Sequence, residues 1–123
     1  MKVLIVDDSR AMRSIVANIF KQIGHETAEA SNGLDAYEKL VASPDFDLVA
    51  VDWNMPVMNG LEFVQKTRAN PAFADVPIMM ITTEIELAQV ATAMQAGANA
   101  YVMKPFSKEV LLSKLESLTP VAR

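Results

Sequence analysis

The chain of 123 residues contains no cysteine, four glycines and a single histidine, His25. The lack of cysteine excludes a fold held together by disulfides, so nothing in the sequence requires an oxidising compartment. One histidine by itself cannot form a cluster of imidazole ligands. Charged residues are also few, at 21%, against 51% hydrophobic residues. This balance excludes a disordered chain and indicates one compact domain spanning residues 1–123.

A basic stripe and a long apolar segment are missing as well. The net charge is −4 and the lysines and arginines are scattered along the chain, so direct binding to nucleic acid is not expected. The segment before the first acidic pair has too few residues for a signal peptide or a membrane span. The sequence therefore predicts a cytoplasmic protein with no membrane partner, and we expect no separate output domain.

Five short apolar runs alternate with longer segments of helical periodicity. This alternation predicts an α/β fold, a doubly wound five-stranded parallel sheet with helices on both faces. The expected strands are residues 2–6, 26–29, 48–52, 77–82 and 100–103. The clearest helix ends before Gly24, a residue type common at helix C-termini. The apolar positions of the other four helices begin at Leu34, Leu61, Leu87 and Leu111.

Three acidic residues stand at the ends of two expected strands. Asp7 and Asp8 follow the first strand, and Asp52 ends the third. If these strands are neighbours, the carboxylates converge, and each pair about 4 Å apart repels by about 4 kcal/mol at an effective dielectric constant of 20. Such a cluster needs a cation, and oxygen ligands favour Mg²⁺, with Mn²⁺ as the alternative. The carboxylates therefore predict a metal-dependent phosphoryl-transfer pocket.

Two more polar residues, Thr82 and Lys104, stand at the ends of the fourth and fifth strands. In a doubly wound sheet the ligand site lies beyond the carboxyl ends of the strands. Each residue also has an ordinary structural explanation. Asp7, Asp8 or Ser9 could cap the next helix, Thr82 suits a strand because it is β-branched, and Lys104 could be solvated. Their occurrence at successive strand ends nevertheless favours a functional site.

A bound Mg²⁺ would balance the charges of these residues. Asp7, Asp8 and Asp52 carry three negative charges, and Mg²⁺ with Lys104 would carry three positive ones. An incoming phosphoryl group adds negative charge that Mg²⁺ and the Lys104 ammonium can stabilise, while the ionised Asp52 can act as the nucleophile. Positioning and electrostatics would therefore suffice for transfer.

Six short motifs resemble the response-regulator receiver family, and the resemblance spans nearly the whole chain. The motifs are Val6-Asp7-Asp8-Ser9, Val51-Asp52-Trp53-Asn54-Met55-Pro56, Asn59-Gly60, Ile81-Thr82-Thr83-Glu84, Ala96-Gly97-Ala98 and Tyr101-Val102-Met103-Lys104-Pro105-Phe106. The resemblance is strongest to the stand-alone chemotaxis members of the family. It implies the flavodoxin-like strand order 2-1-3-4-5 and a phosphoacceptor switch of two-component signalling, in which Asp52 accepts the phosphoryl group.

The resemblance also implies the metal ligands and the partners. Asp8, Asp52 and the main-chain carbonyl of Asn54 would bind Mg²⁺, with Asp7 acting mostly through metal-bound water. The phosphoryl donor would be the phosphohistidine of a histidine kinase or phosphotransfer domain. The phosphorylated protein would bind a downstream protein, such as a component of the flagellar motor switch, and a phosphatase is a further expected partner.

Four residues take the remaining roles that the resemblance implies. Thr82 and Tyr101 match the switch pair that links the phosphoryl group to the output surface, and Asn54 and Glu84 match the positions that tune hydrolysis. The residues by themselves leave Tyr101 equally open to being an ordinary half-buried aromatic in a short strand. The protein is thus expected to be a signalling phosphoacceptor and not an enzyme, assisting only its own phosphorylation and autodephosphorylation.

Other functions remain as alternatives. One is a single-domain receiver in a phosphorelay or another pathway unrelated to the motor. Another is an aspartyl-phosphate phosphatase of the haloacid dehalogenase type, although its nucleophile follows the first strand in an Asp-x-Asp pattern that is absent after residues 2–6. A third is a flavodoxin-like electron carrier, in which Asp7 and Asp8 would repel the phosphate of FMN.

Overall fold

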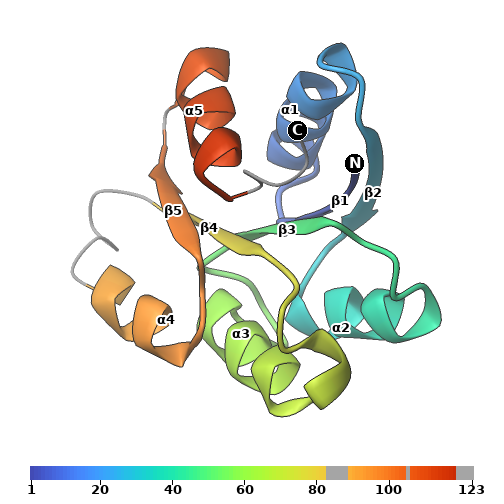
Figure 1. Ribbon diagram of the computed structural model, residues 1–123, viewed down its shortest axis with the longest axis vertical. Coiled ribbons are helices and arrows are strands. Elements are labelled where there is room, and N and C mark those ends of the chain that lie inside the picture. Colours follow the sequence, from blue (N-terminus) through green and yellow to red (C-terminus); the bar gives the residue numbers. More distant parts are fainter. Residues whose placement is uncertain (83–88, 105, 119–123) are drawn as a thin grey trace.

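The computed structural model describes residues 1–82, 89–104 and 106–118 (Figure 1). Strands and helices alternate along the chain, with one short 3₁₀ helix before the fourth strand. The strands are β1 (Lys2–Val6), β2 (Glu26–Ala30), β3 (Leu48–Asp52), β4 (Ile78–Thr82) and β5 (Ala100–Met103). The helices are α1 (Arg10–Gln22), α2 (Gly33–Ala42), α3 (Gly60–Ala69), η1 (Pro71–Phe73), α4 (Val90–Ala96) and α5 (Lys108–Leu118).

The five strands form one sheet in the order β2-β1-β3-β4-β5, and every neighbouring pair is parallel. The expected fold class and strand order are therefore confirmed. The register aligns Val6 with Val51, and Thr82 with Met103. Because all strands run in one direction, the residues that follow β1, β3, β4 and β5 meet at the same edge of the sheet.

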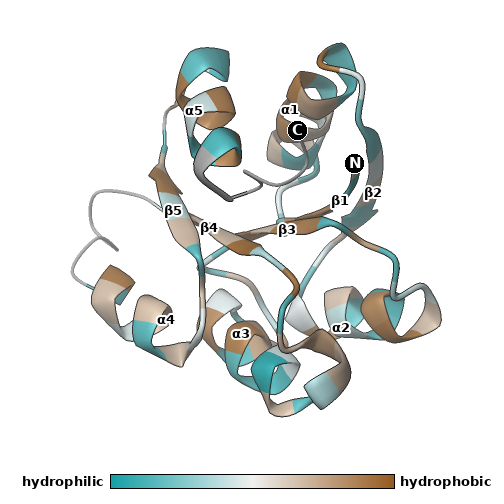
Figure 2. Cartoon of the chain, viewed as in Figure 1, coloured by the Kyte–Doolittle hydropathy of each residue, from teal (hydrophilic) through white to brown (hydrophobic). Residues whose placement is uncertain are grey.

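Helices cover both faces of the sheet, α1 and α5 on one side and α2, α3 and α4 on the other (Figure 1). Each face has its own buried core, one built around Phe20 and Leu111 and the other around Leu40 and Phe63. β3 and β4 are buried along their whole length, and both are strongly hydrophobic in Figure 2. A strand covered on two faces has no solvent side, which explains why these runs lack alternating polar residues.

Side-chain caps determine where the helices begin. Ser9 Oγ accepts a hydrogen bond from the N–H of Met12, so the expectation that a residue near the acidic pair caps the first helix is confirmed for Ser9. At α3, Asn59 and Glu62 form a reciprocal capping box. Ser9 follows the end of β1 by three residues, and Asn59 closes the longer loop that follows β3.

Two expected strand boundaries differ from the structure. β2 extends to Ala30, whose carbonyl accepts the N–H of Asp7. β4 begins at Ile78 instead of residue 77, because Pro77 has no N–H to donate to the sheet, although its carbonyl accepts the N–H of Val49. α4 is described from Val90 onward, and Leu87, where the fourth helix was expected to begin its apolar pattern, lies outside the described residues.

Among residues 1–82, 89–104 and 106–118, no helix is both long and apolar enough to cross a membrane.

Candidate functional site

The carboxylates of Asp7, Asp8 and Asp52 gather at the carboxyl edge of the sheet, as predicted. One oxygen from each lies within 4.8 Å of the others. β1 and β3 are neighbours, so the residues at their ends are brought together. Asp7 and Asp52 are buried, with 2% and 6% of their surface exposed, whereas Asp8 is exposed. The cluster therefore has a buried floor and an open, solvated side.

Lys104 supplies the positive charge of this site. Its Nζ lies 2.9 Å from Asp52 Oδ1 and 3.5 Å from Asp7 Oδ2, and its main-chain N–H donates to the carbonyl of Thr82 at 2.7 Å. Burial alone would lower the pKa of the ammonium, but the hydrogen bond and charge of Asp52, with the charge of Asp7, outweigh burial and raise that pKa. The interpretation of Lys104 as a merely solvated lysine is wrong.

Asp7 is held in place from three directions. Its main-chain N–H donates to the carbonyl of Ala30, its main-chain carbonyl accepts from Arg13 Nη1 at 2.7 Å, and its Oδ1 accepts from the N–H of Ser9 at 2.8 Å. The other carboxylate oxygen, Oδ2, is buried and makes no hydrogen bond of good geometry within the described part of the chain, although the ammonium of Lys104 lies 3.5 Å from it. One long ion pair compensates a buried carboxylate oxygen only in part, which suits an oxygen that also faces a bound cation.

The site fits a small divalent cation by its donors and by its charge. Three carboxylates and one ammonium leave two negative charges, which one divalent ion would neutralise. Carboxylate oxygens are the ligands that Mg²⁺ prefers, and the exposed side of the cluster leaves room for the water that this ion retains. Asn54, the further predicted ligand through its carbonyl, is exposed in the loop that follows β3.

Gly60 allows the loop after β3 to fold tightly beneath the site. A Cβ at this position would lie 2.6 Å from the main-chain oxygen of Asp52, which is too close for any side chain. The N–H of Gly60 also donates to the carbonyl of Trp53 at 2.9 Å. The Asn59-Gly60 pair of the sequence therefore brings the start of α3 against the end of β3 and positions the segment that carries Asp52.

Val57, in the same loop, has a φ of 68°, the only positive φ of a non-glycine residue within the described ranges. A β-branched side chain in this left-handed conformation is strained by about 1–2 kcal/mol. Val57 is 75% exposed, so packing does not compensate for the strain. The carbonyl of the next residue, Met58, accepts the N–H of Gly33 at 2.9 Å, which anchors the loop to the start of α2.

Replacing Val57 with asparagine is expected to raise the free energy of unfolding by about 1 kcal/mol, because asparagine tolerates the left-handed conformation. Val41→Asn is the control, since Val41 is also exposed but lies in α2, where no such strain exists. Urea denaturation of the two variants and the wild type measures the difference. If Val57→Asn is no more stable than the wild type, Val57 is not a strained position.

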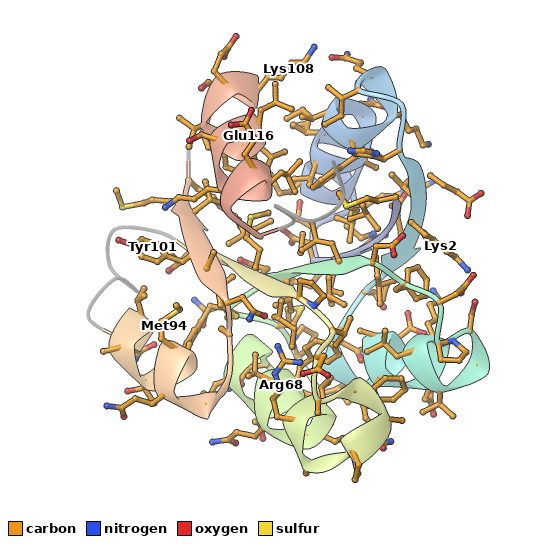
Figure 3. The ribbon with its side chains drawn as sticks, viewed as in Figure 1. Lys2, Arg68, Met94, Tyr101, Lys108 and Glu116 are labelled. Carbon is orange, nitrogen blue, oxygen red and sulfur yellow. The ribbon has the colours of Figure 1, made fainter. Side chains whose placement is uncertain are left out.

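The two residues of the predicted switch pair lie at different depths. Thr82 is fully buried at the end of β4, beside the main-chain contact with Lys104. Tyr101 is half-buried on β5 and packs against the core on the α4 side of the sheet (Figure 3). The ammonium of Lys114 lies 5.0 Å from the centre of the Tyr101 ring. Glu84, the other residue expected to tune hydrolysis, lies outside the described residues.

A hollow of about 480 Å³ lies between β5 and α5, next to Tyr101. Its lining is mostly apolar and includes two exposed hydrophobic side chains, Met103 and Val110. Phe106, Ser107 and Lys114 complete the wall on the α5 side. The half-buried Tyr101 ring therefore borders both the interior of the domain and a surface open to a partner.

Arg13 is the site residue that the sequence did not reveal. It lies on α1, and its guanidinium contacts the carbonyl of Asp7 and the carboxylate of Glu29. Arg10 is in the same helix and is exposed, and its side chain makes no hydrogen bond or ion pair inside the described part of the chain. The helical spacing is the signal that could have found it, because Arg13 is three and seven positions before the buried Val16 and Phe20 and shares their face of α1, whereas Arg10 lies at the margin of that face.

The sequence and the fold were compared with those of known proteins. The profile of the response regulator receiver domain matches residues 3–116. The chemotaxis protein CheY1 of Helicobacter pylori is 50% identical over 117 residues, which are 94% of each chain. The CheY homologue of Campylobacter jejuni is 47% identical, over 96% of this chain and 92% of its own length.

Solved structures agree with these relatives. The chemotaxis protein CheY4 of Vibrio cholerae, crystallised at low pH, superimposes with a TM-score of 0.88 at 37% identity, covering 95% of this chain and 97% of the other. A response regulator structure from Chloroflexus aurantiacus superimposes with a TM-score of 0.90 at 25% identity, covering 99% of this chain and 98% of the other. The match therefore extends over the whole sheet and its helices.

Proposed function

Because the chain belongs to the response regulator receiver domain family and is homologous to the CheY chemotaxis regulators, we propose that Asp52 is the phosphoacceptor of its signalling switch. The contact between Lys104 Nζ and Asp52 Oδ1, at 2.9 Å within a cluster of three carboxylates, is the observation that carries this assignment. Residues 1–123 are proposed to act as one receiver domain. The relatives described above give no support to an aspartyl-phosphate phosphatase or to a flavodoxin-like electron carrier.

The first step is transfer of the phosphoryl group to Asp52. An oxygen of the ionised carboxylate attacks the phosphorus of a phosphohistidine, the new O–P bond forms as the N–P bond breaks, and the imidazole leaves with the electron pair and takes a proton. The ammonium of Lys104 compensates the charge of the Asp52 carboxylate before the step and can move its hydrogen bond to a phosphoryl oxygen afterwards. Its Nζ lies 2.9 Å from Asp52 Oδ1 and therefore next to the oxygens at which the phosphoryl group would bind.

Asp7, Asp8, Asp52 and the main-chain carbonyl of Asn54 would hold Mg²⁺ at the site. When bound, this ion would supply positive charge that the phosphoryl oxygens need and that Lys104 alone does not provide. Asp8 is the carboxylate that reaches the solvated side, and Asp7 is the one fixed to the backbone. Hydrolysis of the acyl phosphate by water would reset the switch, and Asn54 and Glu84 are proposed to tune its rate.

The signal would leave through Tyr101 and the hollow beside it. A phosphoryl oxygen near Asp52 can attract the hydroxyl of Thr82, and movement of that side chain gives Tyr101 a second, inward packing position. The hollow between β5 and α5 offers an apolar surface with a lysine at its rim, which suits an amphipathic helix or a short peptide.

A flagellar motor switch component is the proposed downstream partner. A histidine kinase or phosphotransfer domain is the proposed donor of the phosphoryl group.

Incubation with acetyl phosphate and Mg²⁺, followed by mass spectrometry, tests the phosphoacceptor. The wild type should gain one phosphoryl mass, located at Asp52. Asp52→Asn keeps the size of the side chain but removes the nucleophilic charge, so stable labelling should fall to background. Persistent labelling of Asp52→Asn at another residue would contradict the assignment, and sustained multiple turnover would favour a phosphatase.

Replacing Thr82 with alanine is expected to separate phosphorylation from output. Asp52 should still be labelled, because the nucleophile and Lys104 remain, but the phosphorylated protein should lose most of its preference for the partner. A tenfold preference corresponds to about 1.4 kcal/mol of differential binding, which a few altered contacts can supply. Thr67→Ala, which removes a buried hydroxyl in α3 away from the sheet edge, is the control. Undiminished discrimination by phosphorylated Thr82→Ala would contradict this route for the signal.

A further inference from the structure

We infer that Arg13 is a positioning residue, which holds the peptide between Asp7 and Asp8 so that the two carboxylates face the same cation. This inference rests on the proposed function of the acidic cluster. The guanidinium is mostly buried, with 16% of the side chain exposed, and it joins three elements: the α1 helix to which it belongs, the loop after β1 and the end of β2.

The geometry of the peptide bond explains why one hydrogen bond matters. Arg13 Nη1 donates to the carbonyl of Asp7 at 2.7 Å, and this carbonyl belongs to the planar peptide that connects Asp7 to Asp8. Fixing the carbonyl therefore fixes the orientation of the whole plane, including the nitrogen of Asp8. Asp8 itself makes no hydrogen bond or ion pair within residues 1–82, 89–104 and 106–118. Its direction thus depends on the peptide that Arg13 holds.

Glu29 keeps the guanidinium in this orientation. Its Oε1 lies 3.2 Å from Arg13 Nε, so the two ends of the guanidinium fork have different acceptors. An arginine can satisfy both at once because its donors are fixed in one plane, whereas the ammonium of a lysine is a point charge without that fork. The carboxylate of Glu29 also compensates the charge of Arg13, which reduces its repulsion of a cation at the nearby cluster.

The charge of Arg13 and its positioning role have opposite effects on metal binding. If Arg13 acted only through its charge, neutralising it would make the acidic cluster more negative and would tighten Mg²⁺ binding. If Arg13 positions the Asp7–Asp8 peptide, losing the hydrogen bond should weaken Mg²⁺ binding instead. The direction of the change in affinity therefore distinguishes the two roles.

Titration with MgCl₂, followed by the fluorescence of Trp53 next to Asp52, measures this affinity without any phosphoryl donor. Arg13→Gln is expected to weaken Mg²⁺ binding about tenfold, a typical effect for residues that orient metal ligands. Arg13→Lys retains the charge and should also weaken binding, although less. Arg10→Gln removes the same charge from the exposed arginine of the same helix and should leave the affinity unchanged or slightly higher.

A second measurement excludes a general loss of structure. The Mg²⁺ concentration that gives half-maximal labelling of Asp52 by acetyl phosphate should rise about tenfold in Arg13→Gln, while the rate at saturating Mg²⁺ stays within about twofold of the wild type. Unchanged or tighter binding by Arg13→Gln would overturn this inference alone, as would a fall in the saturated rate with no change in the Mg²⁺ requirement. Absence of any Mg²⁺ response in the wild type would overturn the proposed function as well.

Discussion

Replacing Lys104 with methionine is expected to lower the free energy of unfolding by about 3 kcal/mol when Mg²⁺ is absent. Methionine preserves most of the length of the side chain but leaves Asp7 and Asp52 as buried carboxylates without their ammonium, and removing one partner of a buried pair is strongly destabilising. Lys108→Met, which removes an exposed lysine from α5, should change stability little. Urea denaturation in the presence of a chelator measures both variants.

The same variant should respond to metal and to pH in a defined way. Mg²⁺ should restore more stability to Lys104→Met than it adds to the wild type, because the uncompensated carboxylates attract the cation more strongly.

The pKa of Lys104 is raised in the folded protein, so its ion pairs stabilise the fold below the ordinary lysine pKa of about 10.4. That contribution is lost as the pH rises through the higher folded-state pKa, and the difference between variant and wild type should shrink there. Equal stability of the two proteins at neutral pH would contradict the role given to Lys104.

Replacing Asp8 with alanine is expected to weaken Mg²⁺ binding by about a hundredfold, which corresponds to about 2.7 kcal/mol. Asp8 is the exposed member of the cluster, so its loss removes a ligand and a negative charge without opening a cavity in the core. Apo stability should therefore stay the same or increase slightly, because repulsion between the carboxylates decreases. Titration with MgCl₂ and Trp53 fluorescence gives the affinity, and thermal denaturation in a chelator gives the stability.

Glu38→Ala is the matched control for the loss of one negative charge. Glu38 is exposed on α2, outside the carboxylate cluster, so this variant should keep the Mg²⁺ affinity of the wild type within about twofold. A comparable loss of affinity in both variants would mean that only the overall charge of the protein attracts the cation. An unchanged titration of Asp8→Ala would contradict the metal site itself.

Arg13, Val57 and Gly60 show how the backbone around the proposed phosphoacceptor is held. Gly60 permits the approach of α3 to Asp52, Val57 turns the loop through a strained conformation, and Arg13 fixes the peptide after Asp7. Strain and close approach are tolerated at functional sites when the surrounding contacts determine the conformation. The carboxylates themselves are only part of this site, since their mutual geometry depends on residues that would touch neither phosphoryl group nor metal.

The fold and the convergence of the acidic residues were predictable from local patterns in the sequence. Alternating apolar runs and helical periodicity predicted five parallel strands, and the carboxyl ends of parallel strands share one edge of a sheet. Asp7 and Asp52 were therefore expected to meet, and the structure confirms it. The strand order came from the resemblance to the receiver family, because periodicity alone does not state which strands are neighbours.

The sequence by itself thus determined which residues stand at the strand ends, since that depends only on local alternation and spacing. Tertiary structure decided what each residue does there. It buried Asp7 and left Asp8 in solvent, directed Lys104 to Asp52, and gave Arg13 rather than Arg10 the contact with the β1 loop. These differences arise from how helices turn against the sheet and which side chains they bring into reach, and such contacts join residues far apart in the chain.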